Sequence, residues 1–159
     1  MLRIHSHEPE GYVCPFCRIV EGHDVDPYTL RADIVYQDET VTAFIAAAWW
    51  PENAGHVLVI PNGHYESVYD IPDDVLGAVQ VMGKRMALAL KAMYNCDGTS
   101  FRQHNEPHGD QEVWHYHLHV FPRYAGDELY LRSGEKRYTS PEERAPYAER
   151  LRGYLSPAS

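Results

Sequence analysis

The feature that most constrains the fold is a short run in which histidine alternates with apolar residues. His115, His117 and His119 are separated by single apolar residues. Successive side chains of a β-strand point to opposite faces, so this run predicts a strand from Trp114 to Pro122 with one apolar face and one imidazole face. Packing does not require three imidazoles in strict alternation. We therefore interpret the imidazole face as a chemical site.

The rest of the pattern predicts a single α+β domain. Apolar residues spaced three and four apart predict one long helix from 72 to 94, with Asn95 and Gly98 as its stop. Short apolar runs bounded by turn residues predict four more strands, at 33–37, 40–45, 56–60 and 99–103. Together these elements predict an antiparallel five-stranded sheet with one long helix.

Composition and charge exclude several classes of protein. The chain has 159 residues, 44% of them hydrophobic, and a formal net charge of −9, which opposes nucleic-acid binding. No apolar run approaches the roughly 20 residues of a membrane helix, so no membrane association is expected. The polar start is unlike a signal peptide, and three cysteines make no disulfide framework, so we expect a cytoplasmic protein.

The chain is expected to divide into three parts. These are a flexible N-terminus over 1–12, the main domain over 13–125, and a C-terminal extension with a short helix over 126–159.

A row of imidazoles on one strand face suits two kinds of chemistry. Two or three imidazoles can hold a metal ion, or the central one can attack phosphorus while its neighbour assists the leaving group. The spacing alone does not choose between these uses. Of the other histidines, we expect a structural role for His56 and solvated loop positions for His104 and His108.

Several blocks of the sequence resemble the histidine triad family, whose signature is three histidines alternating with hydrophobic residues. Residues 55–64 resemble the family's glycine–histidine strand that closes on a proline and a further histidine, and Ala43-Phe44 matches the upstream phenylalanine strand. Asn105-Glu106 and residues 110–114 resemble the loop that leads into the triad. The resemblance covers roughly 14–122. It implies a compact α+β fold that pairs as a homodimer through its long helix and a sheet edge.

The resemblance also implies a nucleotide substrate with its α-phosphate against the triad. His117 would be the nucleophile that forms a nucleotidyl-histidine, and His119 would contact a phosphate oxygen or donate a proton to the leaving group. The residues implied to contact phosphate and ribose are Asn105, Gln111, Glu112, Val113 and His119.

The expected activity is hydrolysis of dinucleoside polyphosphates or nucleoside phosphoramidates. A histidine at the third triad position favours water as the acceptor. A transferase or phosphorylase that uses phosphate, and a non-catalytic zinc-stabilised nucleotide-binding module, are the alternatives. No organic cofactor is expected.

The pair Cys14-x-x-Cys17 has two functional interpretations, a redox dithiol or half of a zinc site. The few polar residues before Cys14 do not supply the strand of a thioredoxin-like unit. The resemblance to bacterial-type family members implies that His64 and His115 complete a closed Cys₂His₂ site, which would hold structural zinc. Cys96 is expected to be a small buried hydrophobe.

Two departures from the family pattern concern the substrate. Where family members usually carry Asp or Asn to bind the ribose, the aligned position here is Ala48 or Ala46. Trp49 and Trp50 follow, and either stack on a base or pack in the core. Glu112 stands where a small hydroxyl residue is common. A carboxylate beside a phosphate site is unfavourable unless it points out to solvent or serves a cationic leaving group, and the latter would suit an aminoacyl or lysyl phosphoramidate.

Overall fold

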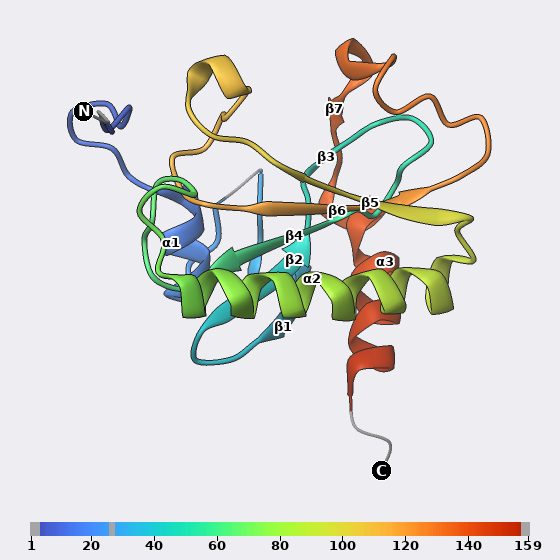
Figure 1. Ribbon diagram of the computed structural model, residues 1–159. Helices are drawn as coiled ribbons and strands as arrows, with labels where there is room; N and C mark the ends of the chain where they lie inside the picture. Colours follow the sequence, from blue (N-terminus) through green and yellow to red (C-terminus); the bar gives the residue numbers. More distant parts are fainter. Residues whose placement is uncertain (1–3, 26–27, 157–159) are drawn as a thin grey trace.

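The computed structural model describes residues 4–25 and 28–156 (Figure 1). Its helices and strands, in chain order, are α1 (Pro15–Val20), β1 (Ile34–Gln37), β2 (Val41–Ile45), β3 (Ala48–Trp49), β4 (Val57–Pro61), α2 (Asp73–Tyr94), β5 (Gly98–Gln103), β6 (Leu118–Arg123), β7 (Arg137–Tyr138) and α3 (Pro141–Leu155). Within these residues, none of the helices has both the length and the apolar character needed to cross a membrane.

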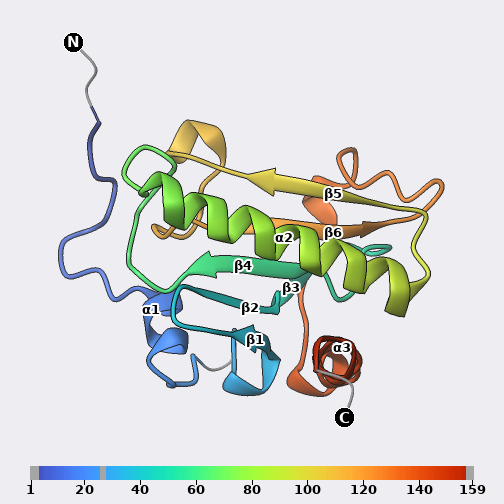
Figure 2. The ribbon, with the colours of Figure 1, turned by 60° about the horizontal axis from the view of Figure 1, so that its bottom comes forward.

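Five strands form one antiparallel sheet in the order β1-β2-β4-β6-β5, and β3 pairs with β7 in a separate two-stranded ribbon. The helix α2 lies across one face of the large sheet (Figure 2). The predicted α+β class, five-stranded antiparallel sheet and long helix are therefore confirmed. The face opposite α2 carries the histidines.

The long helix closely matches its prediction. α2 ends at Tyr94, and Asn95 adopts a left-handed conformation with φ of 53°, the usual way to end a helix. Its buried stripe includes Val79, Met82, Met86 and Leu90. Its outer face leaves Val81 and Leu88 more than half exposed.

The histidine strand starts later than predicted. β6 begins at Leu118, not at Trp114, because the preceding residues leave the sheet to bond with the segment after β4. The Tyr116 amide donates to the Tyr65 carbonyl at 2.6 Å, and the His115 ring bonds the Pro61 carbonyl at 2.9 Å. The alternation survives in this extended segment, since Tyr116 and Leu118 both join the core beneath α2.

The N-terminal segment, expected to be flexible over 1–12, makes specific contacts over 4–12. The Ser6 hydroxyl and the His7 amide both donate to the Glu66 carboxylate, at 2.6 and 2.7 Å. The Glu8 carboxylate bonds the His64 ring. These contacts place the segment along one edge of the domain, beside α1 (Figure 2).

The C-terminal extension is integrated into the domain. α3 is the short helix predicted in this extension, and it packs against β1 and α2. Its Arg144 is fully buried, and its Nε donates to the Asp33 carboxylate at 2.8 Å. The segment before α3 returns to the histidine face, where Ser133, Lys136 and Tyr138 line a cavity.

Candidate active site and metal centre

The imidazole face of the sheet forms the floor of a cavity of about 480 Å³. Leu58 on β4, His119 on β6 and Arg102 on β5 are direct cross-strand neighbours, so they lie in one row across this floor. Apolar residues gather at the Leu58 end, where Pro15, Phe16, Ala46 and Val113 also line the cavity. The Arg102 end is polar and cationic. The cavity is therefore graded from apolar to charged, with the histidines between.

His117 is held in one tautomer by the backbone. Its Nδ1 lies 2.7 Å from the His115 carbonyl, so Nδ1 must carry the proton and donate it. The other ring nitrogen, Nε2, is left with a free lone pair on a residue that lines the cavity. Burial lowers the pKa of His117, which keeps the imidazole neutral near pH 7. A neutral imidazole with a free Nε2 is a nucleophile.

His119 packs between imidazole and aromatic rings. Its ring is stacked with that of Phe121, and its Nδ1 lies 3.4 Å from His56 Nε2. Burial, then the neighbouring positive charges, lower the pKa of His119 well below its usual value. His56 is itself fully buried, and the same two causes lower its pKa to about 3. His56 thus packs beside His119, and it also belongs to the lining of the cavity.

The other predicted site residues divide into two groups. Glu112 and Val113 line the cavity. Asn105 and Gln111 do not, because their side chains bond elsewhere in the protein. The Asn105 amide bonds Gln103 and the Val68 amide, while Gln111 bonds the backbone at residues 66, 106 and 113. These two side-chain amides hold the loop before the triad in place, and their assignment to phosphate and ribose contact stays a prediction.

Trp49 and Trp50 have different surroundings, and the alanines before them lie at the cavity. Trp49 packs in the core, with its Nε1 donating to the Ala46 carbonyl. Trp50 lines the cavity with one edge, and its buried Nε1 has no hydrogen-bond partner among the described residues. The residues 46–48 form an apolar part of the cavity wall, so the ribose anchor usual in the family is absent here as a side chain.

Several cavity residues were not assigned to the site by the sequence, among them Arg102, His104 and Lys136. Arg102 lies on β5, His104 directly follows this strand, and Lys136 comes from the C-terminal extension. His104, expected to be a solvated loop residue, is partly buried and lines the cavity. Its spacing of two residues from Arg102 is the sequence signal that both share a face. Lys136 had no such signal, because its place depends on how the extension folds back.

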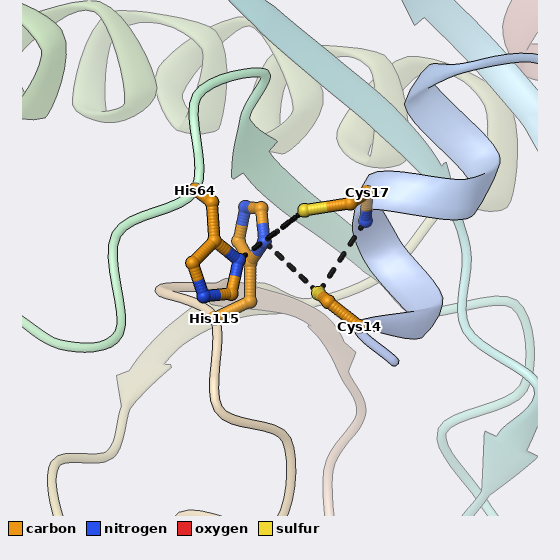
Figure 3. A group of neighbouring side chains, drawn as sticks. All are labelled: Cys14, Cys17, His64 and His115. Atoms are coloured by element: carbon orange, nitrogen blue, oxygen red, sulfur yellow. Dashed lines mark hydrogen bonds between the residues drawn. The ribbon is translucent and has the colours of Figure 1, made fainter. Parts of the chain in front are cut away.

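The pair Cys14 and Cys17 meets His64 and His115 in one cluster (Figure 3). The four donor atoms all lie within 4.8 Å of one another, with Cys14 Sγ 3.3 Å from His115 Nδ1 and Cys17 Sγ 3.2 Å from His64 Nδ1. These spacings suit ligands around a tetrahedral ion with bonds of about 2.0–2.3 Å. The four residues come from α1, the segment after β4 and the approach to β6.

The protonation pattern of the cluster also fits a metal ion. The His115 Nε2 bonds the Pro61 carbonyl and the His64 Nε2 bonds the Glu8 carboxylate, so both Nδ1 lone pairs face the two sulfurs. Burial and the adjacent Cys14 raise the pKa of Cys17 to about 12. A thiol with such a raised pKa becomes a thiolate near neutral pH when a cation binds it. All three cysteines are free thiols, and Cys96 is buried as expected.

The fold and the site together define an α+β domain with a row of histidines on one face of its sheet. Residues 29–126 match the HIT domain, the histidine triad family, and the chain belongs to this family. It is 34% identical over 131 residues to an uncharacterized HIT-like protein of Methanocaldococcus jannaschii, covering 82% of this chain and 95% of that one.

Two solved structures show the same fold. A Hit-like protein involved in cell-cycle regulation from Bartonella henselae has a TM-score of 0.74 and 28% identity, covering 89% of this chain and 96% of that one. A Zn-bound histidine triad family protein from Mycobacterium smegmatis has a TM-score of 0.72 and 29% identity, covering 89% and 92%. The family assignment made from the sequence is thus confirmed.

Proposed function

We propose that the protein is a nucleotide hydrolase that forms a nucleotidyl-histidine intermediate on His117. The observation that carries this proposal is the hydrogen bond from His117 Nδ1 to the His115 carbonyl. It leaves Nε2 unprotonated in a cavity large enough for a nucleotide. Histidine triad membership supports the nucleotide substrate, and the apolar end of the cavity around Phe16 and Leu58 suits a base.

The reaction has two steps. The Nε2 lone pair of His117 attacks the α-phosphorus, and the bond from this phosphorus to the leaving group breaks. Water then attacks the same phosphorus, which releases a nucleoside monophosphate and restores the imidazole. His119, the next imidazole on the same face, contacts the phosphoryl oxygens or the leaving group.

We also propose that the four-residue cluster holds structural zinc. The donor set of two thiolates and two imidazoles fits zinc, and the Zn-bound relative from Mycobacterium smegmatis supports the choice of metal. The ion would connect α1 to the segment that carries the nucleophile. Reduced thiols are needed for this site, which supports a reducing compartment such as the cytoplasm.

A homodimer is proposed from the outer face of α2 and the sheet edge at β5. Val81 and Leu88 on α2 are 62% and 54% exposed, and Phe101 on the edge strand β5 is 41% exposed. An unpaired edge beside exposed apolar side chains favours association with a second copy.

The covalent mechanism is tested with diadenosine tetraphosphate and adenosine 5′-phosphoramidate. Intact-mass analysis of the quenched protein should show an adenylyl adduct that His117→Asn lacks, and AMP should accumulate without added phosphate. The absence of both adduct and turnover on either substrate would overturn the proposal. The phosphorylase alternative predicts a nucleoside diphosphate that appears only when inorganic phosphate is present.

A further inference from the structure

We infer that Arg102, Lys136 and Trp50 form a subsite for an anionic leaving group, so that the enzyme favours substrates that release a phosphate chain over those that release an amine. The inference rests on the proposed function and names its substrate class. It also chooses between the two interpretations of Glu112 that the sequence leaves open, a solvated carboxylate and a partner for a cationic leaving group.

Arg102 is a cation without an anionic partner. Among the described residues, no carboxylate lies within ion-pair distance of its guanidinium, and its polar contact is a 3.4 Å bond from Nη2 to His104 Nε2. The guanidinium lies against the rings of Trp50 and Phe121, at 5.4 and 5.3 Å from their centroids. Its free donors therefore remain available to a ligand, and stacking holds them in place.

The place of Arg102 in the sheet sets what it can contact. It is the direct cross-strand neighbour of His119, on the side away from Leu58. A substrate with its base at the apolar end and its α-phosphorus at the histidines extends its leaving group toward Arg102. The guanidinium fork suits the oxygens of a phosphate chain.

Trp50 is the aromatic part of the subsite. Its side chain lines the same cavity, and its ring centre lies 5.4 Å from the Arg102 guanidinium and 5.7 Å from the Lys136 ammonium. One aromatic face therefore holds both cations at the cavity wall.

The second cation, Lys136, explains the unusual carboxylate of Glu112. The Lys136 ammonium lies 2.8 Å from both Glu112 oxygens and 5.7 Å from the centre of the Trp50 ring. The Glu112 side chain is 73% exposed, so its charge is both paired and solvated. Asp110 is a further acid on the cavity rim and is exposed. Glu112 therefore holds a cation at the cavity and does not present a free negative charge to the leaving group.

The way in which the leaving group departs also favours substrates that release a phosphate chain. When a phosphoanhydride breaks, the electron pair stays on the bridging oxygen, which leaves as a phosphate oxyanion and needs no proton near neutral pH. When a phosphoramidate breaks, the departing nitrogen must take a proton. The guanidinium beside His119 stabilises the departing oxyanion. Burial first, and then the neighbouring imidazoles and Arg102, lower the pKa of His119, which disfavours the imidazolium that would protonate an amine.

The test compares two substrates that form the same adenylyl-His117. Diadenosine tetraphosphate releases a nucleotide anion, and adenosine 5′-phosphoramidate releases ammonia. Arg102→Met should lower kcat/KM for the tetraphosphate by about tenfold to a hundredfold, and change that for the phosphoramidate by less than about threefold. Arg150→Met is the matched control. Like Arg102, Arg150 stacks on aromatic rings, here those of Tyr94 and Tyr147, but it lies on α3 and does not line the cavity. An unchanged ratio of the two kcat/KM values in Arg102→Met overturns the inference.

A binding measurement separates this inference from the proposed function. Inorganic tripolyphosphate should bind the whole protein at low ionic strength in calorimetry, about tenfold more weakly in Arg102→Met and more tightly in Glu112→Gln, which frees Lys136. Binding that depends on Arg102 without any adenylyl adduct would keep the subsite and refute the hydrolase. An adenylyl adduct together with tripolyphosphate binding that is unchanged in Arg102→Met would support the hydrolase and refute the subsite. Thermal unfolding of each variant checks that it is folded.

Discussion

Glu8 should govern the metal affinity of the cluster although it contributes no ligand atom. Its carboxylate accepts a hydrogen bond from His64 Nε2, which orients the ring and makes Nδ1 a better donor. Removing such a partner typically lowers metal affinity by about 10- to 100-fold, or about 1.4–2.8 kcal/mol. Glu8→Gln keeps the shape and removes the charge, so we expect a loss within this range.

The zinc affinity of Glu8→Gln is measured by competition with a chromophoric chelator. At a fixed free zinc concentration above both dissociation constants, the same loss should lower Tm by about 3–10 °C in a domain of this size. Glu10→Gln is the control, because Glu10 is exposed, two residues away, and makes no side-chain hydrogen bond among the described residues. Equal affinities in Glu8→Gln and Glu10→Gln would refute the reasoning, provided that Cys14→Ser abolishes binding in the same assay.

Three further predictions concern stability and assembly. Burial lowers the pKa of His56 from 6.5 to about 3, so between these pH values the unfolded state binds more protons than the folded state, and the free energy of unfolding drops as pH falls. In urea melts, His56→Phe should make the dependence of the free energy of unfolding on pH shallower by about 1.4 kcal/mol per pH unit. An equal pH dependence in the variant and the wild type would contradict this prediction. Leu88→Asp should convert a dimer to a monomer in sedimentation, whereas Leu131→Asp, at an 82% exposed loop position, should not; a monomeric wild type would refute the interface. Asp33→Ala leaves the fully buried Arg144 without its anion and should lower the free energy of unfolding by about 3–5 kcal/mol in urea, while a loss below 1 kcal/mol would disprove the role of the pair.

The parts that sequence predicted well depend on local periodicity. The alternation around His117 survives even where Trp114 to His117 leave the sheet, because the residues between the histidines are needed in the core. The helix 72–94 was predicted to within one residue at its start, since its apolar stripe and the left-handed Asn95 are both local signals. The four metal-site residues meet as the family resemblance implied.

The parts that sequence did not predict depend on long-range contacts. The side-chain amides of Asn105 and Gln111, which are predicted to contact the substrate, also bond within the loop, and no periodicity reveals these contacts. Lys136 reaches the cavity only because the chain after β6 folds back, and Glu8 reaches His64 across 56 residues of sequence. An extension without an apolar pattern gives no sign of the surface against which it will pack.

The His115 residue joins two systems through a single peptide unit. Its ring belongs to the cluster with Cys14, Cys17 and His64, while its carbonyl oxygen accepts a hydrogen bond from His117 Nδ1. Any shift of this peptide group would release the His117 ring to exchange tautomers or rotate, and its Nε2 would then be protonated for part of the time. If the cluster holds zinc and His117 is the nucleophile, as proposed, removal of the metal would slow the chemistry without any contact between metal and substrate. A chelation experiment would then give the result expected of a metalloenzyme, although the ion would only fix the orientation of one ring.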